Sequence, residues 1–159
     1  MSKKEVLEKI VAALSESLEV LQKAARASHE EATHESSRAE NKYDTRGLEA
    51  AYLAGGQAQQ AKELIKSIEL YESLSLREFG ADEPIDVGAV VDLQSDGARS
   101  TYFIGPRNGG LEIDLDGKEV TVVTPQSPLG QQLVGKLTAS RWTAKVGGAT
   151  VKYWVRSVW

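Results

Sequence analysis

The sequence of 159 residues contains no cysteine, which excludes disulfide bonds, cysteine-based zinc sites and thiol nucleophiles. Long apolar runs are also missing, and no stretch of about 18 residues is apolar enough to span a membrane. The first ten residues carry charges every few positions, so we expect no signal peptide and a cytoplasmic protein. A formal net charge of −4 argues against binding free nucleic acid through bulk charge.

Histidine is almost as scarce as cysteine. The two histidines, His29 and His34, are five positions apart, whereas a helical zinc site needs a spacing of four. With both histidines inside a helical pattern, a Ser-His-Asp arrangement is not credible either. These absences leave few routes to an independent enzyme active site.

Proline and glycine are distributed very unevenly. Residues 1–80 contain no proline, four of the 14 glycines, 12 alanines and three valines, whereas residues 81–159 contain all four prolines and 11 valines. Alanine, leucine, glutamate and lysine favour helix, and valine favours strands. Gly80 suits a helix C-cap, and Pro84 cannot continue a helix. The sequence therefore predicts an α+β protein with a helical domain over 1–80 and a β-rich domain over 81–159.

The first half has a helical apolar period that predicts two antiparallel arms of a hairpin, spanning about residues 3–76. In each arm, the apolar residues that recur on one helix face form a seam. Along the chain, the side chains of the first seam become smaller, from leucine to alanine, and those of the second become larger, from alanine to isoleucine. If the chain folds back near residue 43, small residues face small ones and large face large, as even packing in an antiparallel coiled coil requires. The predicted pairs are Ala32–Ala54, Ser28–Ala58, Ala25–Ala61, Leu21–Ile65 and Leu18–Ile68. The turn is expected near Tyr43 to Gly47, within residues 41–49.

The second half alternates between apolar and polar residues and is rich in turn signals. Asp96-Gly97 and Asp116-Gly117 are typical of two-residue hairpin turns. Ser127 followed by Pro128 predicts the N-cap and first residue of a short helix. We therefore expect a small antiparallel sheet with one helix on it. The expected strands are residues 88–94, 100–104, 111–115 and 120–124, followed by a closing hairpin over 144–158.

Charge is segregated within this second half. Residues 120–159 contain five basic residues, no acidic residue and all three tryptophans, Trp142, Trp154 and Trp159. A basic surface that carries tryptophan favours docking of an acidic partner. The alternative is that the tryptophans fill the core while the basic side chains are solvated. Both interpretations stay open on the sequence alone.

Two segments resemble a known family. Residues 123–136, Val-Thr-Pro-Gln-Ser-Pro-Leu-Gly-Gln-Gln-Leu-Val-Gly-Lys, look like the corresponding run of the bacterial transcript-cleavage factors GreA and GreB. Residues 48–57, Leu-Glu-Ala-Ala-Tyr-Leu-Ala-Gly-Gly-Gln, are similar to the segment beside that family's hairpin turn. Together with the order of helical hairpin and β domain, the resemblance covers nearly the whole chain.

The resemblance implies a transcription elongation factor that binds RNA polymerase. It implies an FKBP-like C-terminal domain that docks at the rim of the secondary channel, here around Gln126, Ser127 and Pro128 with Lys136 nearby. It also implies a hairpin whose acidic tip helps to hold a second Mg²⁺ beside the nascent RNA 3′ end, so that the polymerase cleaves its own backtracked RNA. Such a factor has no independent active site, and we expect a monomer.

The predicted tip departs from the family pattern. The family usually places an acid three residues after its tip Asp, and Gly47 stands there after Asp44. Glu49 is then the candidate second carboxylate for catalysis and for the metal. Alternatively, Asp44 is only an N-cap and Glu49 a favourable charge in the first helical turn. A non-catalytic regulator of the same shape is therefore the runner-up, and a prolyl-isomerase-like binding module is a third, weaker alternative.

Overall fold

The computed structural model describes residues 1–33 and 55–159. Contacts divide the chain into two compact units, one comprising Met1–Ile10 with Tyr71–Trp159 and the other comprising Val11–Leu70. The predicted turn over 41–49, with Asp44 and Glu49, lies outside the described residues. The sequence predicts two domains that meet at Gly80, and this boundary stays a prediction.

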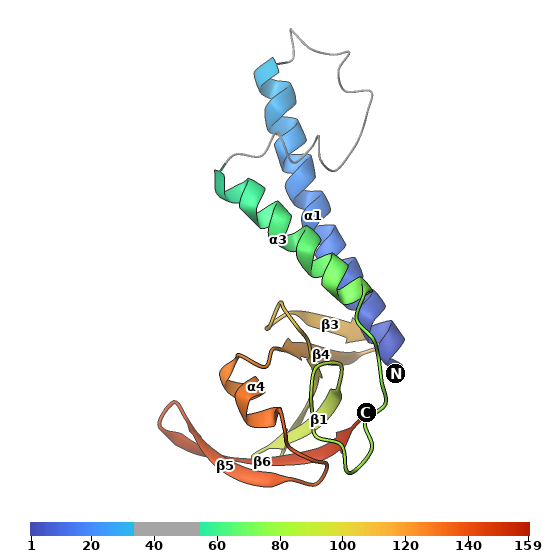
Figure 1. Cartoon of the computed structure of the whole chain (residues 1–159). Helices are drawn as coiled ribbons and strands as arrows, with labels where there is room; N and C mark the ends of the chain where they lie inside the picture. The colour runs from blue at the N-terminus through green and yellow to red at the C-terminus, as the bar shows by residue number, and fades with distance from the viewer. Residues whose placement is uncertain (34–54) are drawn as a thin grey trace. The chain divides into compact units, whose positions relative to one another are not determined.

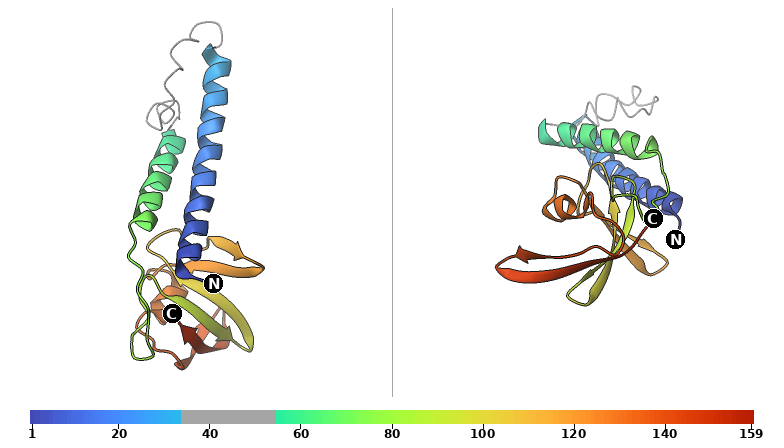
Figure 2. Two further views of the ribbon diagram at one scale, coloured as in Figure 1. Left: turned by 90° about the vertical axis from the view of Figure 1, so that its right-hand side faces the viewer. Right: turned by 60° about the horizontal axis from the view of Figure 1, so that its bottom comes forward.

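Two long helices form the described part of the α-helical region. Helix α1 spans Lys3–Thr33 and helix α3 spans Gly55–Glu72, running back in the opposite direction (Figures 1 and 2). In the unit Val11–Leu70, the predicted seam is buried at Leu18 and Ala25 in α1 and at Ala61 and Ile68 in α3, each at most 4% exposed. The helical assignment and these four seam positions are confirmed, whereas the coiled-coil geometry stays a prediction.

Helix α1 begins with reciprocal capping. The Glu5 backbone N–H donates to Ser2 Oγ at 3.2 Å, and the Ser2 backbone nitrogen donates to Glu5 Oε2 at 2.8 Å. This is the capping-box arrangement, in which a serine and a glutamate three residues later satisfy the unpaired N–H groups of a helix start. The hydrogen bonds from Ser2 also lower the pKa of Glu5.

The region after Gly80 forms one six-stranded sheet and one short helix, so the α+β class is correct. The sheet order is β3-β4-β2-β1-β6-β5, and all neighbouring pairs are antiparallel except β2 and β4, which are parallel. That parallel pair differs from the expectation of a purely antiparallel sheet. It arises because β3 is placed at the sheet edge, so that β4 returns beside β2. The elements are β1 (Val90–Ser95), β2 (Ala98–Ile104), β3 (Glu112–Leu115), β4 (Lys118–Val123), α4 (Pro128–Leu133), β5 (Arg141–Val146) and β6 (Ala149–Val158).

Two-residue turns close the three hairpins of this sheet. Asp96 and Gly97 have φ angles of 48° and 89°, and Asp116 and Gly117 have φ angles of 54° and 86°. Gly147 and Gly148 close the β5–β6 hairpin with φ angles of 59° and 83°. Positive φ at both central residues matches the right-handed twist of the flanking strands, which explains the Asp-Gly and Gly-Gly pairs. The turns predicted at Asp96-Gly97 and Asp116-Gly117 are confirmed.

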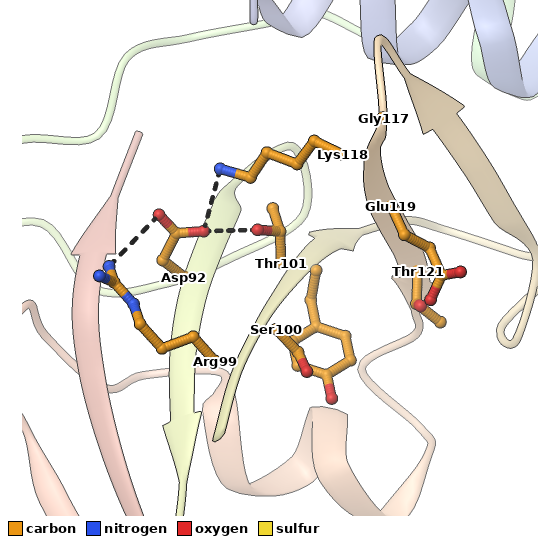
Figure 3. A pocket seen from close by; sticks show the side chains of 9 residues that line it. Asp92, Arg99, Ser100, Thr101, Gly117, Lys118, Glu119 and Thr121 are labelled. Carbon is orange, nitrogen blue, oxygen red and sulfur yellow. Dashed lines mark hydrogen bonds and ion pairs between the residues drawn. The ribbon is translucent and has the colours of Figure 1, made fainter. Parts of the chain in front are cut away.

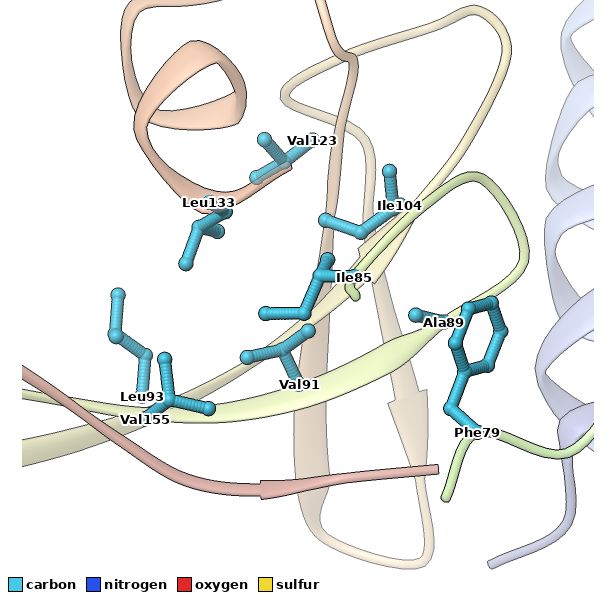
Figure 4. Close-up of a cluster of buried hydrophobic side chains, with 9 residues drawn as sticks. All are labelled: Phe79, Ile85, Ala89, Val91, Leu93, Ile104, Val123, Leu133 and Val155. Carbon is cyan, nitrogen blue, oxygen red and sulfur yellow. The ribbon is translucent and has the colours of Figure 1, made fainter. Parts of the chain in front are cut away.

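The core of the β region lies between the sheet and α4. Figure 4 shows the buried cluster, in which Leu133 of α4 joins strand residues such as Leu93 and Val155. Phe79 and Ile85, from the segment between α3 and β1, complete it. Burial of these apolar side chains is the main favourable term that holds the helix on the sheet. The buried cluster comprises Phe79, Ile85, Ala89, Val91, Leu93, Ile104, Val123, Leu133 and Val155.

The end of α3 is anchored within the larger unit by Tyr71. This side chain is fully buried, its ring lies 6.5 Å from that of Phe103, and its hydroxyl donates to the Arg107 carbonyl oxygen. Burial raises the pKa of Tyr71 to about 12, although the hydrogen bond to Arg107 acts in the opposite direction. A Cβ built at Gly105 would lie 2.3 Å from the Tyr71 hydroxyl, so only glycine fits beside it.

The start of α1 is anchored in the same unit by Lys3. Its side chain is buried, its ammonium donates to the Arg77 carbonyl oxygen, and it lies 4.6 Å from the centre of the Phe79 ring. Burial lowers the pKa of Lys3, because desolvation disfavours the charged form. Arg77 lies over the same ring and pairs with Glu83 at 2.6 Å.

Candidate functional site

The candidate site is the start of α4, where the structure confirms the predicted cap. Ser127 is the N-cap and Pro128 the first helical residue, as expected from their order in the sequence. Ser127 Oγ accepts the Gly130 backbone N–H at 3.1 Å and donates to the Thr124 carbonyl oxygen at 2.8 Å. One hydroxyl therefore joins the end of β4 to the first turn of the helix.

Gly130 is required by a close backbone approach. A Cβ built on this residue would lie 1.7 Å from the Thr124 carbonyl oxygen and 2.9 Å from Ser127 Oγ. The carbonyl belongs to the backbone and cannot rotate away as a flexible side chain would. The Ser-Pro-Leu-Gly sequence thus encodes a tight strand-to-helix turn. Its serine caps the start of α4, and its glycine leaves room for the Thr124 carbonyl oxygen.

The exposed part of this turn is formed by its outermost residues. Gln126 and Pro128 are exposed and Ser127 is half-buried. The Gln126 backbone carbonyl oxygen accepts from Gln131 Nε2 at 3.0 Å. A rigid turn with an exposed amide and an exposed proline ring is a suitable surface for docking, because little backbone freedom is lost on binding.

Lys136 follows the end of α4 and is fixed to it through an aromatic ring. Its ammonium lies 5.0 Å from the centre of the Trp142 ring, and Trp142 Nε1 donates to Gln132 Oε1 at 2.9 Å. Backbone hydrogen bonds hold the segment too, since Ile85 and Lys136 pair at 2.9 Å and Gly135 donates to Ile85 at 2.9 Å. The Gln132–Trp142 link was not predicted, because the sequence separation of ten residues gives no local signal.

The three tryptophans are all partly exposed and divide between two environments. Trp142 is on the core side of the β5–β6 hairpin and stacks on Tyr153 at 5.2 Å. Trp154 is contacted instead by Arg141 and Arg156, whose guanidinium carbons lie 3.8 Å and 3.7 Å from its ring centre. Trp159 lies 5.7 Å from the Lys118 ammonium. The core interpretation therefore describes Trp142, and the basic-surface interpretation describes Trp154.

A second polar site surrounds Asp92 on the other half of the sheet (Figure 3). Its carboxylate accepts from Thr101 at 2.6 Å, and Lys118 and Arg99 lie at 3.6 Å and 4.0 Å. Ser157 donates to its second oxygen at 3.2 Å. These partners come from β2, β4 and β6, and Asp92, Arg99, Thr101 and Lys118 help to line a depression of about 590 Å³. Because both oxygens of the Asp92 carboxylate already have partners, the arrangement is best explained as a structural link between strands.

Within the residues that the structure describes, no group of three or more His, Asp or Glu side chains could hold a metal ion. The two predicted carboxylates, Asp44 and Glu49, are outside this part of the chain, so their role in binding Mg²⁺ stays a prediction. Within residues 1–33 and 55–159, no helix is both long and apolar enough to cross a membrane.

Comparisons with known proteins find similar solved structures only. No protein-family model matches the sequence, and no curated protein matches it significantly. Gfh1 of Thermus aquaticus is 22% identical, over 98% of this chain and 92% of that one, with a TM-score of 0.38. GreA factor homolog 1 (Gfh1) of Thermus thermophilus is 21% identical, over 97% and 92%, with a TM-score of 0.36. A further structure, described as the transcription factor Gfh1, is 22% identical over 97% and 91%, with a TM-score of 0.40. Values this low support no functional conclusion.

Proposed function

We propose that this protein is a transcription factor that binds bacterial RNA polymerase at its secondary channel, with the start of α4 as the docking surface. The observation that carries the proposal is the turn at Ser127 to Gly130. The segment that resembles GreA and GreB most specifically is also the one whose geometry requires its particular residues, a capping serine and a glycine against the Thr124 carbonyl. Exposed Gln126 and Pro128 make the contact, and Lys136 adds a positive charge held on Trp142.

The docking proposal is tested with the full-length protein and purified polymerase. Gln126→Ala and Lys136→Gln should each weaken binding severalfold, because both remove a contact without changing the backbone of the turn. Lys62→Gln, which removes an exposed charge from α3, is the matched control and should bind as the wild type does. Added salt should weaken wild-type binding as screened charge contacts require. Unchanged affinity in both site variants would refute the docking surface.

We further propose that the protein stimulates cleavage of backtracked RNA by the polymerase and has no active site of its own. Asp44, with Glu49 as the second carboxylate, would supply ligands to a Mg²⁺ shared with the polymerase near the RNA 3′ end. A hard divalent cation retains several waters and needs only one or two added carboxylates. A second metal in such a site stabilises the attacking oxygen of the displacement.

Replacement of Asp44 by Asn separates the catalytic role from a capping role. The amide removes the charge with little change in shape, so polymerase binding should survive while the cleavage rate on backtracked complexes falls. If Asp44 is only a helix N-cap, asparagine caps about as well as aspartate, so Asp44→Asn should leave both the stability and the cleavage rate nearly unchanged. The measurement compares both proteins over a range of Mg²⁺ concentrations, and equal rates would remove Asp44 from the mechanism.

The second candidate function is a polymerase-binding regulator that does not promote cleavage. The observation in its favour is Gly47, which stands where the family usually carries its second tip acid. Binding to polymerase without stimulation of cleavage by the wild-type protein would establish this function. A prolyl-isomerase-like module is the weakest alternative, because fold alone does not carry function, and failure to bind polymerase would be needed to favour it.

A further inference from the structure

The outer face of the β5–β6 hairpin carries a concentrated positive charge. Alternate residues of each strand share a face, and away from the hairpin turn the exposed side chains of this face are basic or polar, with Trp154 partly buried among them. The register places Arg141 opposite Trp154 and Thr143 opposite Lys152. The face comprises Arg141, Thr143 and Lys145 of β5 with Lys152, Trp154 and Arg156 of β6, and we call it the β5–β6 outer face.

Trp154 holds two guanidinium groups in place on this face. The guanidinium carbons of Arg141 and Arg156 lie 3.8 Å and 3.7 Å from the centre of its ring. Gln94 Oε1, in the adjacent row of β1, accepts from Arg156 Nη1 at 3.5 Å. Stacking on an aromatic ring leaves the edge N–H donors of a guanidinium available. The guanidinium groups of Arg141 and Arg156 are thus preorganised to bind oxygen anions. The Trp154 ring is already in contact with these two groups.

These cations have no carboxylate partner in the described part of the chain. Within residues 1–33 and 55–159, no ion pair is found for Arg141, Lys145, Lys152 or Arg156, which agrees with the absence of any acid after Glu119. Arg141 and Lys152 help to line a depression of about 750 Å³. One acid, Asp96, also lines it, and its carboxylate accepts the Lys152 backbone N–H at 2.8 Å. The positive charge of the face is therefore left for a partner.

The strand β5 is also an edge of the sheet. It pairs with β6 on one side, and no described strand pairs with its other side. An edge strand presents unpaired backbone N–H and C=O groups to which an extended chain can add. Alternate side chains of such a chain repeat about every 7 Å, which matches the spacing of Arg141, Thr143 and Lys145 along β5.

We propose that the β5–β6 outer face and the β5 edge bind an extended acidic segment of a partner protein with carboxylates at alternate positions. The guanidinium forks on Trp154 receive carboxylates, and the edge of β5 supplies backbone pairing. Single-stranded nucleic acid fits less well, because it cannot continue a β-ladder and the Trp154 ring is covered by guanidinium groups rather than open for base stacking. This surface is separate from the start of α4, and the proposal does not depend on the proposed function.

Direct binding of a model peptide to the full-length protein tests the proposal. The probe is a fluorescent peptide of Thr-Glu repeated five times, compared by anisotropy with Thr-Gln repeated five times and with a ten-nucleotide oligouridylate. Arg141→Gln with Arg156→Gln should weaken binding of the glutamate peptide at least about fivefold. Arg141→Lys with Arg156→Lys keeps the charge but removes the stacked forks, and should weaken it similarly. Lys62→Gln with Lys66→Gln removes the same charge from α3 and should change nothing.

Four results would overturn the proposal. The first is no binding of the glutamate peptide by the wild-type protein at low salt. The second is an equal loss of peptide affinity in the α3 control variant, which would show that only the net charge of the protein matters. The third is wild-type affinity in the lysine variant, and the fourth is tighter binding of oligouridylate than of the peptide. Urea unfolding of each variant, followed by circular dichroism, verifies that any loss of binding occurs in folded protein.

Discussion

Replacement of Gly130 by alanine tests whether the turn at the start of α4 depends on backbone proximity. Helix propensity alone predicts a gain, because alanine is favoured over glycine inside a helix by about 1 kcal/mol. The structure predicts the opposite, since the new Cβ would lie 1.7 Å from the Thr124 carbonyl oxygen, whereas real Cβ contacts are essentially never below 3.0 Å. Either the carbonyl or the helix start must then move by more than an ångström.

The magnitude follows from what such a movement would break. Ser127 donates to the Thr124 carbonyl from both its backbone nitrogen, at 3.1 Å, and its hydroxyl, at 2.8 Å. Loss of two hydrogen bonds costs about 1 kcal/mol each, and strain in a packed region adds about 1–3 kcal/mol. After subtracting the gain in helix propensity, Gly130→Ala should lower the free energy of unfolding by about 2–4 kcal/mol.

Urea unfolding monitored by tryptophan fluorescence is the appropriate assay. All three tryptophans are in residues 120–159, so the signal reports on the unit that contains α4. Gly56→Ala in α3 is the control, because no described atom lies within 4 Å of a Cβ at that position, and its unfolding is also followed by far-UV circular dichroism since Gly56 lies in the other unit. The control should match or exceed wild-type stability. A Gly130→Ala protein as stable as the wild type would show that the close approach to Thr124 does not constrain the turn.

Two further changes probe the site and its support. Ser127→Ala removes the α4 N-cap and should cost about 1 kcal/mol in urea unfolding, and an unchanged midpoint would contradict the capping role. Tyr71→Phe should cost about 1 kcal/mol at pH 7 through the lost hydrogen bond to Arg107. Because burial raises the Tyr71 pKa from 10.0 to about 12, the unfolded state loses this proton first as the pH rises. Wild-type stability should therefore fall by up to about 2 kcal/mol between pH 10 and 12, after allowance for partial screening. Unfolding curves of Tyr71→Phe should lack this part of the decline, and identical pH profiles would contradict it.

Local chemistry in the sequence determined most of the elements. Asp96-Gly97 and Asp116-Gly117 became hairpin turns because positive φ at both positions is inexpensive for these residues. Ser127 and Pro128 began α4 because a serine hydroxyl can satisfy a helix-start N–H while proline lacks one. The helical period likewise identified buried seam positions such as Leu18 and Ile68. Each of these effects acts over a few residues, so the sequence is sufficient to reveal it.

Contacts between distant residues decided the rest. The parallel pairing of β2 with β4 depends on where β3 is accommodated, and no local pattern encodes that choice. The opposite environments of Trp142 and Trp154 follow from the alternation of β5 and β6 and from which sheet face α4 covers.

By itself, the sequence determined the α+β class, the turns, the α4 cap and the separation of acidic and basic charge. Only the tertiary structure decided that Gly130 needs the space beside Thr124, that Trp142 joins Lys136 to Gln132, and that Trp154 holds two guanidinium groups at a sheet edge. The physical reason is range. Propensities, caps and turns depend on neighbours along the chain, whereas packing and stacked charges depend on partners brought together by the whole fold.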